Sequence, residues 1–479
     1  MTSDPRRHFS TVALARAAVF ALALSACAVG PDFVTPAPPD VDRFTPEKTA
    51  SPGNGQRFKE GAGVPARWWT AFGSKPLDAL IQEALDRSPT LEAADAAIRV
   101  AQYNADAATG AFFPQIGLNS NSSYTLSSGD STTTTVTQSA YSFFTKQVQI
   151  SYAPDIWGAN LRTVEGLDAQ RDMQGFQKEA AYLTLAADVA KAAIEEASLR
   201  AQLAATHRII DLDQERLTLL ETQLTHGAVA GTDILSQQSA LAQARQTLLD
   251  FERRLATQRN LLTALAGRYP SQEVGETFDL AHIAVPREIP VSLPADVVAQ
   301  RPDIKAAEAS VHAASAQVGV AVAARLPNIV LTANGGTSAF QLAQLFSPGT
   351  GFYGLAGNVG QPVFDGMTLL NKQKAAQAGL EQAEAKYRDT VITAFRNVAD
   401  SLRALQSDAR SVKEAQVAEG AAKQYLDKIR SQLKFGGVSQ LAVVDAQRTL
   451  LNASISCVQA KAQRLTDTAA LFVALGGGW

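Results

Sequence analysis

The chain is poor in the residues that build metal sites and disulfide frameworks. Its two cysteines, Cys27 and Cys457, lie far apart in the sequence and predict no disulfide framework. Cys457 falls in a helical stretch and is predicted to be a buried small apolar residue, with a reactive thiol as the alternative. The five histidines form no pair at ligand spacing. We therefore expect no bound metal and no cofactor.

Net charge, catalytic motifs and long apolar runs are also lacking. Forty-three basic and forty-six acidic side chains leave a net charge of −3, which gives no long-range attraction for a nucleic acid. The sequence has no Walker loop, no HExxH, no nucleophile elbow and no His/Cys cluster, so we do not expect an enzyme. After the N-terminus no apolar run reaches about 18 residues, so no transmembrane helix is expected in the mature chain.

The N-terminus has the pattern of a bacterial lipoprotein precursor. Arginines precede or interrupt an apolar run, Ala17–Leu24, which predicts a signal peptide over residues 1–26. The run ends in LSAC, the form of a lipobox, so Cys27 is predicted to be acylated and to become the first mature residue; the alternative is an ordinary signal peptide with a chance cysteine. Residues 27–66, rich in Pro, Gly and Thr, are expected to form a lipidated extended segment over a surface.

The remainder of the chain is an internal duplication. Residues 88–118 align without a gap on residues 301–331, with prolines, alanines and apolar positions in register. This alignment predicts a first repeat at 67–267, a linker at 268–293 midway along the molecule, and a second repeat at 294–479. The aligned pairs include Pro89 with Pro302, Ala93 with Ala306, Pro114 with Pro327, Ile116 with Ile329 and Leu118 with Leu331.

Each repeat is predicted to contain one very long helix and two shorter ones. Residues 161–226 and 367–435 lack proline, and at 1.5 Å per residue each would span about 100 Å. Glycines break both, and helices follow at 233–265 and 441–475. Shorter helices are expected at 91–112 and 296–325, each ending before a proline. Stacked end to end, the two short helices of a repeat could lie alongside its long one.

Between the first short helix and the long helix, each repeat has a strand, a loop and a second strand. The hairpins are expected at about 115–152 and about 328–361, with loops at 127–142 and 339–351. Their strands alternate between an apolar and a polar face, which fits a transmembrane β-hairpin. A half-buried soluble hairpin is the alternative. The lipobox and the duplication favour the membrane.

Several long segments resemble the lipoprotein (NodT/OprM-like) branch of TolC-type outer-membrane efflux ducts. They are CAVGPDFVTP after the lipobox, the WWTAFGSKPLDALIQEAL run, RPDIKAAEASVHAASAQVGVAVAARLPNIVL, GQPVFDG and LKFGGVSQLAVVDAQRTLLNA. Two tryptophans in the second segment, Trp68 and Trp69, are expected to anchor the first helix.

The resemblance implies a mainly α fold with a small transmembrane β part. Long antiparallel helices would form a periplasmic α-barrel, and four strands per chain would join a 12-stranded trimeric outer-membrane β-barrel. The implied protein is a homotrimeric, passive exit duct in the outer membrane, lipid-anchored and extending into the periplasm. It receives small molecules, drugs or other toxic compounds, from an inner-membrane pump through a periplasmic adaptor.

The resemblance also points to a gate. Asp445 matches an acidic position that narrows the entrance in such ducts, whereas the companion position is Ala442. Asp233 occupies the equivalent place in the first repeat and is the second candidate. Three converging aspartates would repel one another and attract cations. A helix N-terminal charge stabilised by the dipole is the alternative for both.

The two glycine breaks are expected to form the periplasmic tips. Small and apolar residues around them are predicted to contact the adaptor, although turn chemistry alone also accounts for them. These residues are Gly227, Ala228, Val229, Ala230, Gly436, Gly437, Val438 and Ser439.

Two other functions remain open. One is a duct for metal-ion or type I protein export; three methionines without a cluster argue against metal. The other is a non-pore structural periplasmic lipoprotein, which would explain the lipobox and the helices but not the duplicated hairpins. The substrate, the pump and the adaptor are not specified by the sequence.

Overall fold

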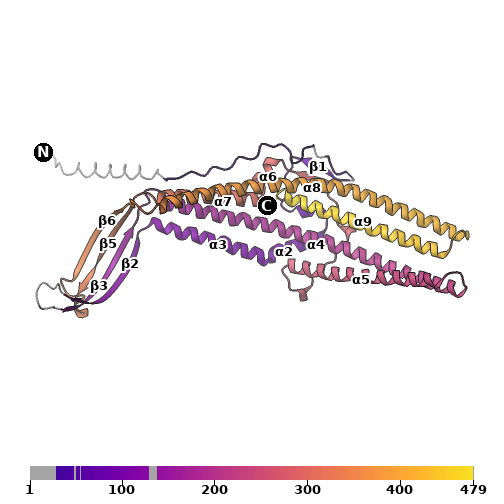
Figure 1. The fold of residues 1–479 in the computed structure, drawn as a ribbon, viewed down its shortest axis with the longest axis horizontal. Helices are drawn as coiled ribbons and strands as arrows, with labels where there is room; N and C mark the ends of the chain where they lie inside the picture. The colour runs from indigo at the N-terminus through magenta and orange to yellow at the C-terminus, as the bar shows by residue number, and fades with distance from the viewer. Residues whose placement is uncertain (1–27, 48–49, 54, 129–137, 478–479) are drawn as a thin grey trace, which may run out of the picture. The chain divides into compact units, whose positions relative to one another are not determined.

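The computed structural model describes residues 28–47, 50–53, 55–128 and 138–477 (Figure 1). The predicted signal peptide and the acylated Cys27 lie outside the described residues. The described chain forms two compact units, and each unit takes residues from both sequence repeats. The strand unit comprises 28–36, 97–174 and 307–387; the helical unit comprises 37–96, 175–306 and 388–477.

The long helices have equal lengths in the two repeats. Helices α4 (Ala159–Thr225) and α8 (Thr368–Lys434) have 67 residues each. Helices α5 (Gly231–Leu265) and α9 (Gln440–Ala474) have 35 each and follow tight turns (Figure 1). Their length follows from the absence of proline, which would remove a backbone hydrogen bond and clash with the preceding turn. None of the described helices has an apolar stretch long enough to cross a membrane.

The prediction of one helix over 296–325 is wrong. The structure has α6 (Pro294–Gln300) and a separate α7 (Pro302–Ala323). Arg301 between them is extended, with φ −70° and ψ 124°, because the ring of Pro302 disfavours a helical conformation in the residue before it. The first repeat has the same break, where Ser88 separates α2 (Lys75–Arg87) from α3 (Pro89–Thr109).

A four-stranded antiparallel sheet combines the hairpins of the two repeats. Its order is β2 (Gln115–Ser128), β3 (Gln138–Tyr152), β5 (Asn328–Ala339) and β6 (Gly351–Gly360). The predicted loop at 127–142 is too long, because β3 already pairs with β2 from Gln138 onward. Backbone hydrogen bonds between the strands extend the hairpin through a Ser/Thr-rich stretch whose composition alone is typical of a loop.

A second, small sheet joins the N-terminal segment to the linker between the repeats. Strand β1 (Arg57–Glu60) pairs in parallel with β4 (Glu288–Val291). Neither strand was expected, since only four residues of each take part and the pairing joins segments more than two hundred residues apart. Ile289 is fully buried, so the linker contributes to the core of the helical unit.

The core of the helical unit contains both tryptophans expected to anchor the first helix. Trp68 and Trp69 begin a short 3-10 helix, η1 (Trp68–Phe72), and are almost fully buried. The Trp69 indole donates a hydrogen bond of 2.9 Å to Asp78 in α2, which fixes the start of that helix. The prediction that Cys457 is buried is confirmed, and burial raises the pKa of its thiol.

A pair of aspartates faces each other between α8 and α9 inside the helical unit. Burial, then a hydrogen bond with Asp467 and repulsion from it, raises the pKa of Asp408 from 3.8 to about 7, while the nearby Arg464 opposes the rise. Arg464 is itself buried and donates to Gln56 (2.7 Å) and to the Gly53 carbonyl (2.9 Å), which fastens the N-terminal segment to α9.

This pair predicts a pH-dependent stability. Because the folded pKa of Asp408 is raised, its contribution is fully present below pH 3.8 and is lost as the pH rises to about 7. Asp408→Asn should therefore flatten the dependence of Tm on pH between about 4 and 7. Thermal unfolding of both proteins across this range checks it. Parallel Tm curves for the two proteins would contradict the raised pKa.

Candidate functional site

The two helical tips have the same backbone turn. In each turn, a backbone amide donates to the carbonyl five residues earlier in the chain. The Ala228 amide donates to the Gln223 carbonyl and the Gly437 amide to the Gln432 carbonyl, both at 2.9 Å. Gly227 and Gly436 hold left-handed conformations, with φ of 70° and 72°. These features define a Schellman C-cap, in which glycine avoids the steric cost of positive φ.

The tips place different side chains in solvent. Val229 and Val438 are half-buried, and Val438 packs on an apolar cluster formed by Leu426, Ile429, Val443 and Ala446. Ala228, by contrast, is exposed. Phe435 is 91% exposed beside the turn glycine and was not among the predicted contact residues. Its sequence signal was a large aromatic residue directly before a glycine pair.

Asp233 takes the role that its alternative predicted. Its carboxylate accepts a hydrogen bond of 3.0 Å from the Ala230 amide at the start of α5. An acidic group there satisfies a backbone donor and interacts favourably with the helix dipole. The residue is exposed and forms no ion pair with any residue that the structure describes, so its position as a gate stays a prediction.

Asp445 lies in an ion-pair group that connects α9 to α4. It pairs with Arg216, and one turn further along α9 Arg448 reaches Asp213 at 3.2 Å. Asp213 is fully buried and also accepts from the Gln237 amide of α5 (3.2 Å). Charge-assisted contacts thus join three helices two to three turns from the tips, which would oppose any outward movement of α9.

The four-stranded sheet has two chemically different faces. The predicted alternation is present: large side chains on one face are exposed, from Ile116 at 72% to Tyr353 at 87%. The other face carries amides and hydroxyls, and Asn119 donates to Gln149 across the β2–β3 pair at 3.1 Å. No residue of that face in the described strands is charged. Nothing within the described chain covers the apolar face.

The residues that directly follow Cys27 are held tightly in the strand unit. Arg162 of α4, 5% exposed, donates to Asp32 (2.5 Å) and to Glu165 (2.8 Å). Glu165 also contacts His312 of α7 (3.0 Å), and the His312 ring stacks on Phe33 with centroids 4.3 Å apart. Two helices therefore fix the chain just beyond the predicted lipid.

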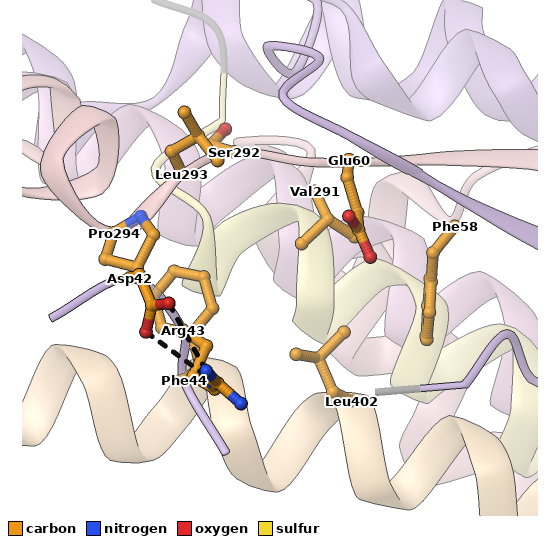
Figure 2. A pocket seen from close by; sticks show the side chains of 10 residues that line it. All are labelled: Asp42, Arg43, Phe44, Phe58, Glu60, Val291, Ser292, Leu293, Pro294 and Leu402. Atoms are coloured by element: carbon orange, nitrogen blue, oxygen red, sulfur yellow. Dashed lines mark hydrogen bonds and ion pairs between the residues drawn. The ribbon is translucent and has the colours of Figure 1, made fainter. Parts of the chain in front are cut away.

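In the helical unit the N-terminal segment borders a cavity of about 290 Å³. Figure 2 shows Leu402 of α8 facing it between Phe44 and Phe58, with the Asp42–Arg43 pair at its edge. The lining is mostly apolar and includes no pairing of a nucleophile with a base. It does not provide an enzyme-like constellation.

Comparison with known proteins identifies the family. The outer membrane efflux protein family model matches residues 80–268 and 293–477. The pyoverdine export outer membrane protein OpmQ of Pseudomonas putida is 31% identical, over 96% of each chain. The cation efflux system protein CusC of Escherichia coli is 26% identical, over 96% of this chain and 97% of the relative. The structure of the outer membrane protein VceC of Vibrio cholerae matches with a TM-score of 0.76 and 27% identity, over 87% of this chain and 99% of the other.

The chain belongs to the outer membrane efflux protein family, so the resemblance found in its sequence is confirmed. It is an efflux channel protein of the outer membrane, and the proteins it matches are transport proteins. The predicted fold class, long helices with a small part made of strands, is confirmed as well.

The ion-pair group predicts unequal effects of its two arginines. Arg448→Met leaves the buried Asp213 without its cation and should lower local stability by roughly 2–5 kcal/mol. Arg216→Met is the matched control, because its partner Asp445 is 46% exposed, and should cost about 0–1 kcal/mol. Hydrogen exchange of amides in α9 measures both. Equal loss of protection in the two variants would contradict the burial argument.

Proposed function

We propose that three copies of this chain form the exit duct of a tripartite efflux system. The observation that carries the proposal is the sheet with one exposed apolar face, one uncharged polar face and two open edges. Within the described chain, β2 pairs only with β3 and β6 only with β5. In lipid each unpaired backbone group costs several kcal/mol, so the edges must pair with other copies.

The number of copies follows from the size of a barrel. Two copies of four strands give eight, and the interior of an eight-stranded barrel is filled by side chains. Three copies give twelve strands, enough for a water-filled lumen lined by the polar face. The apolar face then meets lipid, as in other transmembrane barrels.

The duct is passive and conducts small organic molecules. Its lining is mainly amides and hydroxyls and carries no charge in the described strands, so it neither attracts nor rejects a solute by charge, and it lacks the Met, His and Cys ligands that would favour a metal. Relatives are named for export of pyoverdine and efflux of toluene, which supports organic compounds for this chain.

The N-terminus is anchored by lipid on Cys27. The ion pair of Asp32 and the stacking of Phe33 support this, because they hold the chain a few residues after Cys27 in the strand unit. Each buried CH₂ of such a lipid contributes about 0.8 kcal/mol to membrane binding.

The tips receive the compound from an inner-membrane pump through a periplasmic adaptor. The gate lies at Asp445, whose pairing with Arg216 keeps α9 against α4. Asp233 is the weaker candidate, because its carboxylate already caps α5.

Conductance of the purified full chain in planar bilayers tests the duct and its gate. The wild type should form channels, and Asp445→Asn should increase single-channel conductance and weaken block by multivalent cations, since it removes both the ring of negative charge and the link to α4. Asp233→Asn is the control and should change neither. Unchanged conductance in Asp445→Asn would remove the gate assignment. A stable monomer in detergent without channel activity would refute the duct.

Adaptor binding tests the tips. Phe435→Ala removes the 91% exposed ring and should weaken capture of the cognate adaptor by about thirtyfold, because truncation of an aromatic hot spot costs about 2 kcal/mol. His226→Ala, at the corresponding place of the first tip, is the matched control. Pull-down with purified adaptor gives the measurement. Undiminished binding by the Phe435 variant would place the adaptor contact elsewhere.

A further inference from the structure

Three aromatic side chains form a cluster on the polar face of the sheet, apart from Phe352 of β6 on the same face. Tyr141 and Phe143 of β3 share a face with Gln147 and Gln149, because alternate residues of a strand point the same way. Phe340, directly after β5, lies with its ring centroid 5.9 Å from that of Tyr141 and 5.6 Å from that of Phe143. The rings lie near the first residues of β3 and just after the last residue of β5, which is the end of the sheet away from the helices in sequence.

The three rings line an open recess of about 470 Å³. The recess is shallow, so a flat aromatic group could lie against its rings without being enclosed. Phe340 is 64% exposed and Tyr141 43%, so the cluster is not a closed core.

Other copies of the chain would leave the recess open. It belongs to β3 and β5, the inner strands of the sheet, which already have a partner on each side. In the proposed duct, neighbouring copies pair with β2 and β6. The rings therefore face the lumen, where exposed aromatic surface is unfavourable in water unless an apolar group covers it.

We propose that this recess binds the aromatic rings of compounds leaving the duct, so that three such sites surround its outer end. The inference depends on the proposed function, since the polar face must line a pore. Ring-to-ring contact and the attraction of cations to aromatic faces supply a weak affinity. Weak binding is what conduction requires, because a solute must enter a site and also leave it.

Block of single-channel current by two organic cations tests the recess. Tetraphenylphosphonium and tetrabutylammonium have the same charge, but only the first has aromatic rings. Added from the outer side of the wild-type channel, tetraphenylphosphonium should block at a concentration roughly 3- to 10-fold lower. The double variant Phe143→Ala/Phe340→Ala should bring the two blocking concentrations together.

A matched control lies on the same strand. Phe144 neighbours Phe143 but faces the opposite side of the sheet, so Phe144→Ala should keep the wild-type ratio. Phe340→Leu keeps apolar volume without a ring and should reduce the ratio while open-channel conductance shows that the barrel is intact.

The outcomes separate the two proposals. Channels that both cations block equally, or a ratio lowered as much by Phe144→Ala, would overturn the aromatic site and leave the duct. Failure of the wild type to form channels would overturn the duct and this site with it.

Discussion

The requirement that backbone groups be hydrogen-bonded controls this structure. The sheet of β2, β3, β5 and β6 has two open edges and an exposed apolar face, so neither water nor lipid suits it alone. In the proposed duct, pairing of edges between copies would satisfy the backbone, and lipid would cover the apolar face. The polar side of the sheet would then become the lumen, and the inner strands would keep their faces free.

Duplication has repeated the backbone of the tips but not their charges. Both turns are Schellman caps with glycine at positive φ. Asp445 and Arg448, however, correspond to Ser236 and Ser239 in the first repeat. The buried Asp213 of α4 is therefore neutralised from the second repeat alone. Of the two helical hairpins, the one that contains α9 is held by ion pairs near its tip. A change in these charges would therefore affect the position of α9 more than that of α5.

The N-terminal segment is a structural part of the protein. It is fixed in the strand unit by the ion pair between Asp32 and Arg162 and, in the helical unit, by β1 and by the buried Arg464. Its proline-rich composition predicts an extended course, because such a chain cannot form helix hydrogen bonds. The composition does not predict which residues the segment contacts, because its partners are single residues on helices far away in the sequence. Its pairing with β4 could not be predicted either, because strands of only four residues carry too little pattern to be recognised.

The sequence alone determined the repeats, the helix lengths, the alternation of the strands, the family and the candidate aspartates, because these depend on local patterns: period, proline, glycine and motif. Tertiary structure decided which partner each charge meets. Asp445 pairs with a residue 229 positions away and Arg448 with one 235 away, and no local pattern encodes such pairs. It also decided where β3 begins. Strand pairing carried Tyr141 out of a predicted loop and onto the polar face beside Phe143, and only there do the two rings meet Phe340.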